Sequence, residues 1–263
     1  KQNPPIKIAS YQYAYELDVN HQNSFAVEVN HLLCAIKTLN LSYDVDVAEF
    51  NEKMLEEDNK KQFITDSMEK ALANKEFKVF YQPKHSASYK TLDGFEALVR
   101  WFEPTKGIIP PNEFIPLFEN NGFISNLDMY IFETVLNDLS KIKSMGLKPL
   151  PVSINLSRRD LLSFDIDHYV MPLLKKYDID KSLIHFEITE SIAGNNEVIL
   201  SQTRKIKEAG ISIEIDDFGS GYSSLGMIDI IPMDYLKLDI TFARNIEKKK
   251  EVVKTIIALA HAL

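Results

Sequence analysis

The sequence predicts an α/β protein built around a mostly parallel sheet, and three observations lead to that prediction. From residue 77 onward, short apolar runs that are typical of buried strands alternate with helical patterns. The runs recur roughly every 20–35 residues, the spacing that a strand–helix–strand unit needs. Polar residues interrupt these runs near their C-terminal ends. Together the observations indicate strands that are buried on both faces and share one polar edge.

The first 62 residues differ in character and predict a small α/β unit. Residues 6–15 alternate between apolar and polar side chains as a strand does, and a helical pattern begins at Asn23-Ser24. A short strand-like run follows at 43–50, and residues 51–74 form a charged helical stretch. We therefore expect a small domain over 1–62, which includes a connecting helix, and a larger domain over 63–263.

The larger domain is expected to contain six strands. They lie at 77–82, 94–101, 152–156, 184–189, 211–216 and 235–239. The link between the first two, residues 84–93, is too short and too polar for a crossover helix, so the first strand should be antiparallel and the other five parallel. Helical patterns lie near 112–122, 127–145, 165–177, 195–209, 221–230 and 248–263.

The composition of the 263 residues limits the classes of function. Acidic residues outnumber basic ones by 38 to 30, and the formal charge of −8 argues against binding to a DNA or RNA polymer. It does not argue against a small phosphate ligand, since metal ions can supply local positive charge. Cys34 is the single cysteine, and no apolar run approaches the roughly 18 residues of a membrane span. We therefore expect a cytoplasmic chain, with a membrane or sensor domain upstream remaining open.

Polar side chains at the strand ends favour a barrel over an open sheet, although six strands fit both. The residues are Glu96, Asn155, Glu187, Asp216, Asp217 and Lys237. In a (β/α)8 barrel the C-terminal strand ends converge on one rim, where catalytic groups gather. Each acid alone is more often a solvated charge or a helix cap, but the repeated placement indicates a shared site.

A bound cation would explain why several carboxylates occur together. Gathered carboxylates repel one another, and their burial without a partner is costly. Oxygen ligands favour hard ions such as Mg²⁺ or Mn²⁺, and the adjacent Asp216 and Asp217 could serve two ions. The sequence thus predicts a two-metal site for phosphoryl chemistry, with Lys237 beside it. The histidines lack ligand spacing and are expected at the surface or in the core; His185, two residues before Glu187 on the same face, is the least certain.

Seven sequence motifs over residues 70–263 resemble the EAL domain family. They are Tyr81-Gln82-Pro83, Glu96-Ala97-Leu98-Val99-Arg100-Trp101, Glu113-Phe114-Ile115-Pro116-Leu117, Ser153-Ile154-Asn155-Leu156-Ser157, Phe186-Glu187-Ile188-Thr189-Glu190-Ser191, Asp216-Asp217-Phe218-Gly219-Ser220-Gly221 with Tyr222-Ser223-Ser224-Leu225, and Asp234-Tyr235-Leu236-Lys237-Leu238-Asp239. Their order and spacing agree with the family throughout.

The resemblance implies a bacterial signalling phosphodiesterase that opens cyclic di-GMP to linear pGpG with Mg²⁺ or Mn²⁺. The implied fold is a modified TIM barrel whose first strand is antiparallel. The implied metal ligands are Glu96, Asn155, Glu187, Asp216 and Asp217. Lys237 would position the hydrolytic water, and Glu190 would steady the loop that holds the two aspartates. Gln82, Leu98 and Arg100 fall where the family contacts the dinucleotide, and the guanidinium of Arg100 suits a phosphate better than an amine would.

Three departures from the family pattern give further expectations. After Lys237 the family supplies two more strands, one with a glutamate that completes the metal site and one with a glutamine near the ligand. We therefore expect a barrel that is incomplete at its C-terminus and inactive as it stands. Residues 1–62 resemble the C-terminal part of a GGDEF domain without the Gly-Gly-Asp-Glu-Phe turn. The helix near 221–230 lies where a homodimer interface usually forms in the family.

Two other functions stay open on the sequence alone. The first is a catalytically inactive EAL domain that binds cyclic di-GMP and signals to a partner. The second is a scaffold that has lost binding as well. The retained acids at 96, 187, 216 and 217 favour the enzyme, because inactive members usually lose metal ligands.

Overall fold

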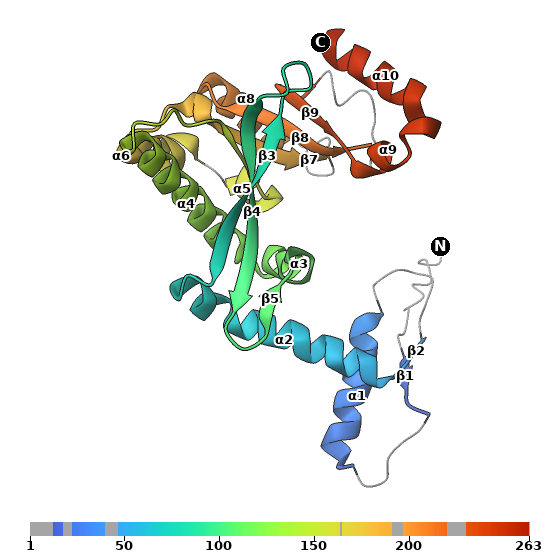
Figure 1. Ribbon diagram of the computed structural model, residues 1–263. Coiled ribbons are helices and arrows are strands. Elements are labelled where there is room, and N and C mark those ends of the chain that lie inside the picture. Colours follow the sequence, from blue (N-terminus) through green and yellow to red (C-terminus); the bar gives the residue numbers. More distant parts are fainter. Residues whose placement is uncertain are drawn as a thin grey trace, which may run out of the picture. The chain divides into compact units, whose positions relative to one another are not determined.

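The computed structural model describes residues 13–17, 23–39, 47–163, 165–190, 197–219 and 230–262. The chain divides into two compact units, Lys1–Glu69 and Lys70–Leu263. Figure 1 labels the elements of both. In the described part of the chain, no helix is long and apolar enough to span a lipid bilayer.

The first unit is a small α/β arrangement. Strands β1 (Tyr13–Tyr15) and β2 (Val47–Glu49) pair in parallel, and helix α1 (Phe25–Thr38) connects them along the chain. Helix α2 (Glu52–Ala73) begins in this unit. Its core is formed by Cys34, Ala35, Ala48 and Phe50. The predicted helix after Ser24 is confirmed, while residues 6–12 of the first predicted strand lie outside the described part.

The second unit contains a mixed sheet in the order β3-β4-β6-β7-β8-β9 (Figure 1). Its strands are β3 (Phe77–His85), β4 (Leu92–Glu103), β6 (Val152–Asn155), β7 (Ile184–Thr189), β8 (Ser212–Phe218) and β9 (Tyr235–Leu238). The pair β3–β4 is antiparallel and each later pair along this path is parallel, so the predicted strand directions are confirmed. A short strand, β5 (Gly107–Ile109), adds to β4. The first two strands are longer than predicted, so their link shrinks to residues 86–91.

Helices follow the strands at most of the predicted places. They are α3 (Pro111–Asn121), α4 (Ile124–Ser144), α5 (Arg158–Ser163), α6 (Met171–Tyr177) after a π-turn η1 (Ile166–Val170), a short η2 (Lys181–Leu183), α8 (Glu197–Glu208), α9 (Ile240–Arg244) and α10 (Ile246–Ala262). The short elements β5, α5 and α9 were not predicted, because a single turn or bridge carries too little periodicity. The predicted helix at 221–230 lies almost wholly outside the described residues.

One face of the sheet is apolar and covered by helices, and we call it the helix-covered face. It carries Ala97, Val99 and Trp101 of β4 and the alternate isoleucines of β7 and β8, all buried. The rings of Phe77, Trp101, Phe114 and Phe118 pack here, with Phe77 and Trp101 centroids 5.1 Å apart. Because side chains alternate along a strand, the intervening residues point to the opposite face. That opposite face, which carries Ser153, Glu187 and Glu214, we call the polar face.

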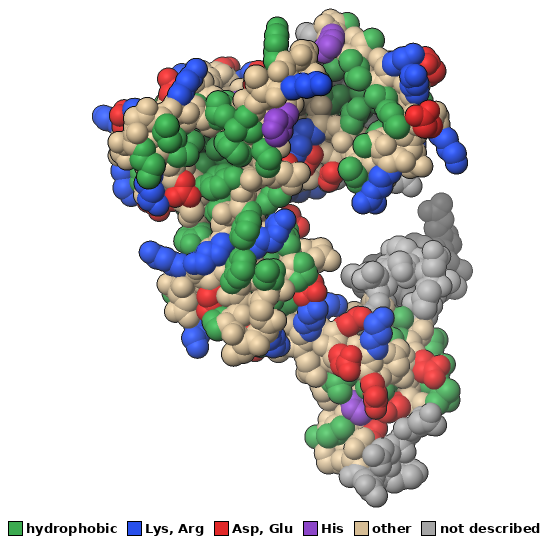
Figure 2. Space-filling view, in the orientation of Figure 1, with side chains coloured by type: hydrophobic (Ala, Val, Ile, Leu, Met, Phe, Trp, Pro, Cys, Tyr) green, Lys and Arg blue, Asp and Glu red, His purple; other side chains and the backbone are tan. Residues whose placement is uncertain are grey.

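The surface of the second unit mixes charges of both signs. On the side shown in Figure 2, Lys and Arg side chains are interspersed with Asp and Glu side chains. This distribution agrees with the modest excess of acids in the chain, which has a formal charge of −8.

Candidate metal centre

Four of the predicted site residues meet on the polar face, each from a different strand. The ammonium nitrogen of Lys237 on β9 lies 3.2 Å from Glu96 Oε2, 3.0 Å from Glu187 Oε1 and 3.1 Å from Asp216 Oδ1. One carboxylate oxygen from each of the three acids also lies within 4.8 Å of the other two. The strands that supply these acids are β4, β7 and β8, so the cluster depends on the strand order of the sheet.

Glu187 is the most confined member of the cluster. It is 1% exposed, and neither carboxylate oxygen has a hydrogen-bond partner among the described residues, so its only close cation there is the Lys237 ammonium. Burial, and next the neighbouring Glu214 carboxyl, raise the pKa of Glu187, while Lys237 opposes them. A buried carboxylate without donors is costly unless a cation lies beside it. The donor set of three carboxylates therefore fits a divalent ion such as Mg²⁺ or Mn²⁺.

Lys237 remains charged in this setting. Burial by itself would lower the pKa of its ammonium group, but Glu187, Asp216 and Glu96 raise that pKa well above the usual range. The cluster then contains one positive charge beside three carboxylates. The remaining negative charge is what a divalent cation would offset.

The segment that carries Asp216 and Asp217 has an irregular backbone. Asp217 has a φ of 55°, in the left-handed region that side chains rarely adopt, and the β8–β9 register shifts between Ile215 and Phe218. Burial first, and then the adjacent Asp216, raise the pKa of Asp217. Strain of this kind is concentrated at functional sites. The irregularity turns two successive acids away from the plain alternation of a strand.

Glu190 fixes the end of this segment. It is buried at 7% exposure directly after β7, and its Oε2 accepts a hydrogen bond from the Gly219 backbone N–H at 2.7 Å. Gly219 has a φ of 85°, and a Cβ there would lie 2.5 Å from the Phe242 ring. The turn after Asp217 therefore needs glycine, and Glu190 ties it to the neighbouring strand.

The remaining predicted residues lie around this centre. Asn155 is the last residue of β6 and is in register with Glu187, while Gln82 is the cross-strand partner of Glu96. Glu96 itself lies within β4 and not at its end, because β4 runs on to Glu103 and pairs with β5. The prediction that every ligand sits at a strand's C-terminal end was wrong for this residue.

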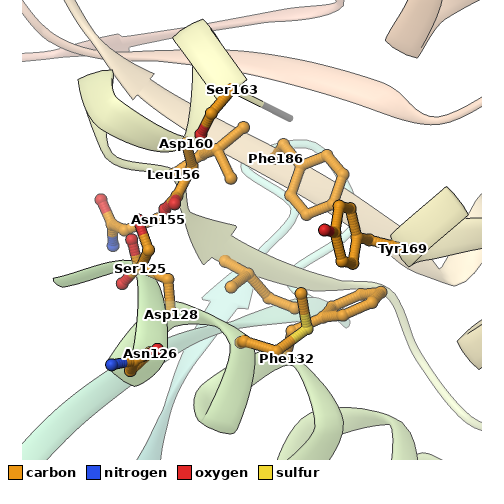
Figure 3. Close-up of a pocket in the computed structure, with 12 residues that line it drawn as sticks. Ser125, Asn126, Asp128, Phe132, Asn155, Leu156, Asp160, Ser163, Tyr169 and Phe186 are labelled. Atoms are coloured by element: carbon orange, nitrogen blue, oxygen red, sulfur yellow. The ribbon is translucent and has the colours of Figure 1, made fainter. Parts of the chain in front are cut away.

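Two cavities adjoin the centre through Asn155. The first, of about 250 Å³, is lined by Leu98, Arg100 and Asn155 among others. The second, of about 350 Å³, lies between α4, β6 and η1 (Figure 3). In Figure 3 the rings of Phe132, Tyr169 and Phe186 form one side of this cavity, and Asn155 and Asp128 lie on the other.

Sequence reasoning missed a second polar cluster on the same face. Glu214 is 1% exposed and is bonded to Lys84, Ser153 and His185. Burial tends to raise the pKa of Glu214, but the bond from His185, together with Glu187 and Lys84, holds that pKa well below its usual range. His185 is therefore a core residue, as expected, but a paired one. The signal for Glu214 was its place two residues before Asp216, inside an apolar run.

Comparison with known proteins gives consistent results. The family model described as the EAL domain matches residues 65–263. The cyclic di-GMP phosphodiesterase PdeR of Escherichia coli is 34% identical over 205 residues, which cover 76% of this chain and 31% of that protein. The cyclic di-GMP phosphodiesterase NbdA of Pseudomonas aeruginosa is 30% identical over 218 residues, which cover 81% and 28%. The family match does not reach residues 1–62, so the GGDEF-like character of that stretch stays a prediction.

Solved structures agree with the fold. The PaMucR phosphodiesterase in complex with c-di-GMP has a TM-score of 0.70 and 28% identity, and the match covers 76% of this chain and 82% of that one. The EAL enzyme Bd1971, with cAMP and cyclic di-GMP bound, has a TM-score of 0.71 and 32% identity over 80% and 58%. The chain spans between about a quarter and a third of the length of the first curated relatives it matches, at 26%, 31% and 26%.

Proposed function

The chain belongs to the EAL domain family, and from this premise we propose that it is a metal-dependent phosphodiesterase that hydrolyses cyclic di-GMP to linear pGpG. The observation that supports the proposal most is the buried carboxylate of Glu187, which lacks a hydrogen-bond donor among the described residues and lies beside Glu96 and Asp216. This arrangement suits an ion in place of a stabilising polar contact. The curated and structural relatives act on or bind the same dinucleotide.

Glu96, Asn155, Glu187, Asp216 and Asp217 are proposed to hold two Mg²⁺ or Mn²⁺ ions. When bound, such ions lower the pKa of a coordinated water and offset charge on the phosphodiester oxygens. The chain contributes the carboxylate and amide oxygens, from four strands. Glu190 contributes indirectly, by holding the turn at Gly219 next to the two aspartates.

Lys237 is proposed to hold the attacking water or a phosphate oxygen by hydrogen bonding. Its pKa is raised by the surrounding acids, so it keeps its proton at neutral pH. A permanently protonated amine donates hydrogen bonds and offsets negative charge, but it cannot act as a general base. The proton of the attacking water must therefore pass to another group.

Gln82, Leu98 and Arg100 are proposed to bind the dinucleotide. Glu96, Leu98 and Arg100 alternate along β4, so all three project from the same face as the metal centre. Leu98 and Arg100 also line the cavity that includes Asn155. An Arg guanidinium can contact a phosphate through two parallel hydrogen bonds, and Leu offers an apolar surface for a base.

The test is hydrolysis of cyclic di-GMP by the full-length protein, with linear pGpG separated by chromatography. We expect turnover with Mn²⁺ or Mg²⁺, loss of turnover with a chelator and recovery when Mn²⁺ is restored. Tight binding of cyclic di-GMP without turnover would contradict the proposal and favour the inactive receptor. Absence of both turnover and binding would leave the scaffold function instead.

A further inference from the structure

A second layer of polar residues lies on the polar face, beneath the candidate metal centre. We call it the lower cluster, and it consists of Lys84, Ser153, His185 and Glu214. Its residues come from β3, β6, β7 and β8. His185 precedes Glu187 by two residues and Glu214 precedes Asp216 by two, so each lies one step below a proposed metal ligand on the same face.

Every donor of the lower cluster converges on Glu214. The Lys84 ammonium lies 2.8 Å and 2.9 Å from its two carboxylate oxygens, and Ser153 Oγ donates to Oε1 at 2.8 Å. His185 Nδ1 lies 2.6 Å from the same Oε1. Lys84 also contacts the Ser153 hydroxyl. A single carboxylate thus occupies one ammonium, one hydroxyl and one imidazole.

Stability alone does not account for this arrangement. Burying an ion pair costs desolvation, and replacing such a pair with apolar residues of similar volume is often neutral or stabilising. The interior of a (β/α)8 barrel is usually filled by branched apolar side chains. A buried Lys–Glu pair at this depth therefore points to a role in the site above it.

Glu187 and Glu214 show opposite degrees of pairing although they are neighbours. The two residues are register partners on β7 and β8, so their side chains project side by side. Glu214 takes all the donors of the lower cluster, whereas Glu187 has no hydrogen-bond donor among the described residues and pairs with Lys237 above. The charge of Glu214 also repels the Glu187 carboxylate from below.

We propose that Glu214 is a positioning residue for Glu187: by occupying Lys84, Ser153 and His185, it prevents these donors from capturing the Glu187 carboxylate and leaves that carboxylate directed to the metal centre. The role rests on the proposed function, because it assumes that Glu187 binds a metal ion. It assigns the lower cluster to metal affinity, and it places the capturing cation at Lys84.

The test compares Glu214→Gln with the double variant Lys84→Met/Glu214→Gln in the full-length protein. The first leaves Lys84 without its carboxylate, so Lys84 should attract Glu187. We expect its Mn²⁺ affinity to fall by roughly 10-fold or more, as for other residues that orient ligands. The double variant removes the capturing cation and should bind Mn²⁺ within about threefold of the wild type, well inside that range. Binding is measured without substrate, from the electron paramagnetic resonance signal of free Mn²⁺.

A matched control is Glu133→Gln, which removes an exposed carboxylate paired with Lys176 at 2.7 Å and should leave Mn²⁺ affinity unchanged. Wild-type affinity in Glu214→Gln, or equal losses in the single and double variants, would overturn the positioning role. If Glu214→Gln does not fold, as judged by circular dichroism, then Glu214→Asp and the double variant decide. Both should keep Mn²⁺ affinity within about threefold, and a larger loss in either would overturn the role.

The same titration separates this role from the proposed function. A wild-type protein that binds no Mn²⁺ would overturn both. A wild-type protein that binds Mn²⁺ while Glu214→Gln binds it equally well would overturn the positioning role alone.

Discussion

The two faces of the same sheet differ in almost every respect. On the helix-covered face, Trp101 and Phe77 are fully buried among other aromatic rings. On the polar face, equally buried positions carry Glu187 and Glu214. Burial on the first face stabilises the fold, whereas burial of charge on the second costs stability unless partners or ions offset it. The comparison teaches that burial alone does not identify the core, and that the polar face is retained for its chemistry.

The largest expected effect is on the helix-covered face. Trp101→Ala removes a fully buried ring that packs on Phe77 and Phe114 and whose Nε1 donates to Glu76 at 3.0 Å. We expect a loss of roughly 3–5 kcal/mol in the free energy of unfolding, measured by urea denaturation. Tyr89→Ala, which removes an exposed ring, is the control and should change it by less than about 0.5 kcal/mol. A loss below about 1 kcal/mol for Trp101→Ala would remove the basis of the comparison.

The next effect is on the polar face and concerns activity. Asp216→Asn keeps the shape of the side chain but removes one of the three clustered charges. Turnover of cyclic di-GMP should fall by more than the roughly 10–100-fold typical of residues that only orient ligands. The thermal unfolding midpoint should stay the same or rise, because repulsion within the cluster is reduced. Asp178→Asn, at an exposed pair with Lys143, is the matched control for turnover. Retained activity in Asp216→Asn would show that the proposed metal assignment is wrong.

A smaller effect tests the one acidic exception near the helix-covered side. Asp128 on α4 borders the cavity of Figure 3 together with Asp160. Burial first, and then the Asp160 carboxyl, raise the pKa of Asp128 well above its usual range. A raised pKa in the folded state means that its contribution to stability is full below the unfolded pKa, near 3.9, and is lost as pH rises through the folded value.

Asp128→Asn cannot ionise and should therefore stabilise the fold at pH 7 but not at pH 4. We expect the unfolding midpoint to rise by roughly 2–4 °C at pH 7 and to change little at pH 4. Thermal denaturation followed by circular dichroism at both pH values measures this. An equal rise at both, or a fall at pH 7, would contradict the pKa direction.

The sequence predicted much of this contrast, because each part had a local signal. The strands at 152–155 and 184–189 stand out as apolar runs, and Glu187 stands out because a charge inside such a run is unusual. The short polar link after β3 predicted the antiparallel first pair. Family resemblance then supplied roles for residues such as Arg100, whose isolated position carries no signal.

Other features depend on tertiary structure and had no comparable signal. Lys84 was placed in a loop, because Pro83 and the polar residues that follow hide the end of β3. Glu214 was overlooked because attention fell on strand ends, although it shares a face with Asp216. The contacts of Lys237 with three acids, and the left-handed backbone of Asp217, arise only when strands distant in sequence are brought together.

The most direct measurement of the central claim is anomalous diffraction from crystals of the full-length protein grown with Mn²⁺. The account predicts manganese peaks bonded to Glu96, Glu187 and Asp216, with Lys237 beside them. Crystals that contain Mn²⁺ elsewhere and none at these three carboxylates would contradict it.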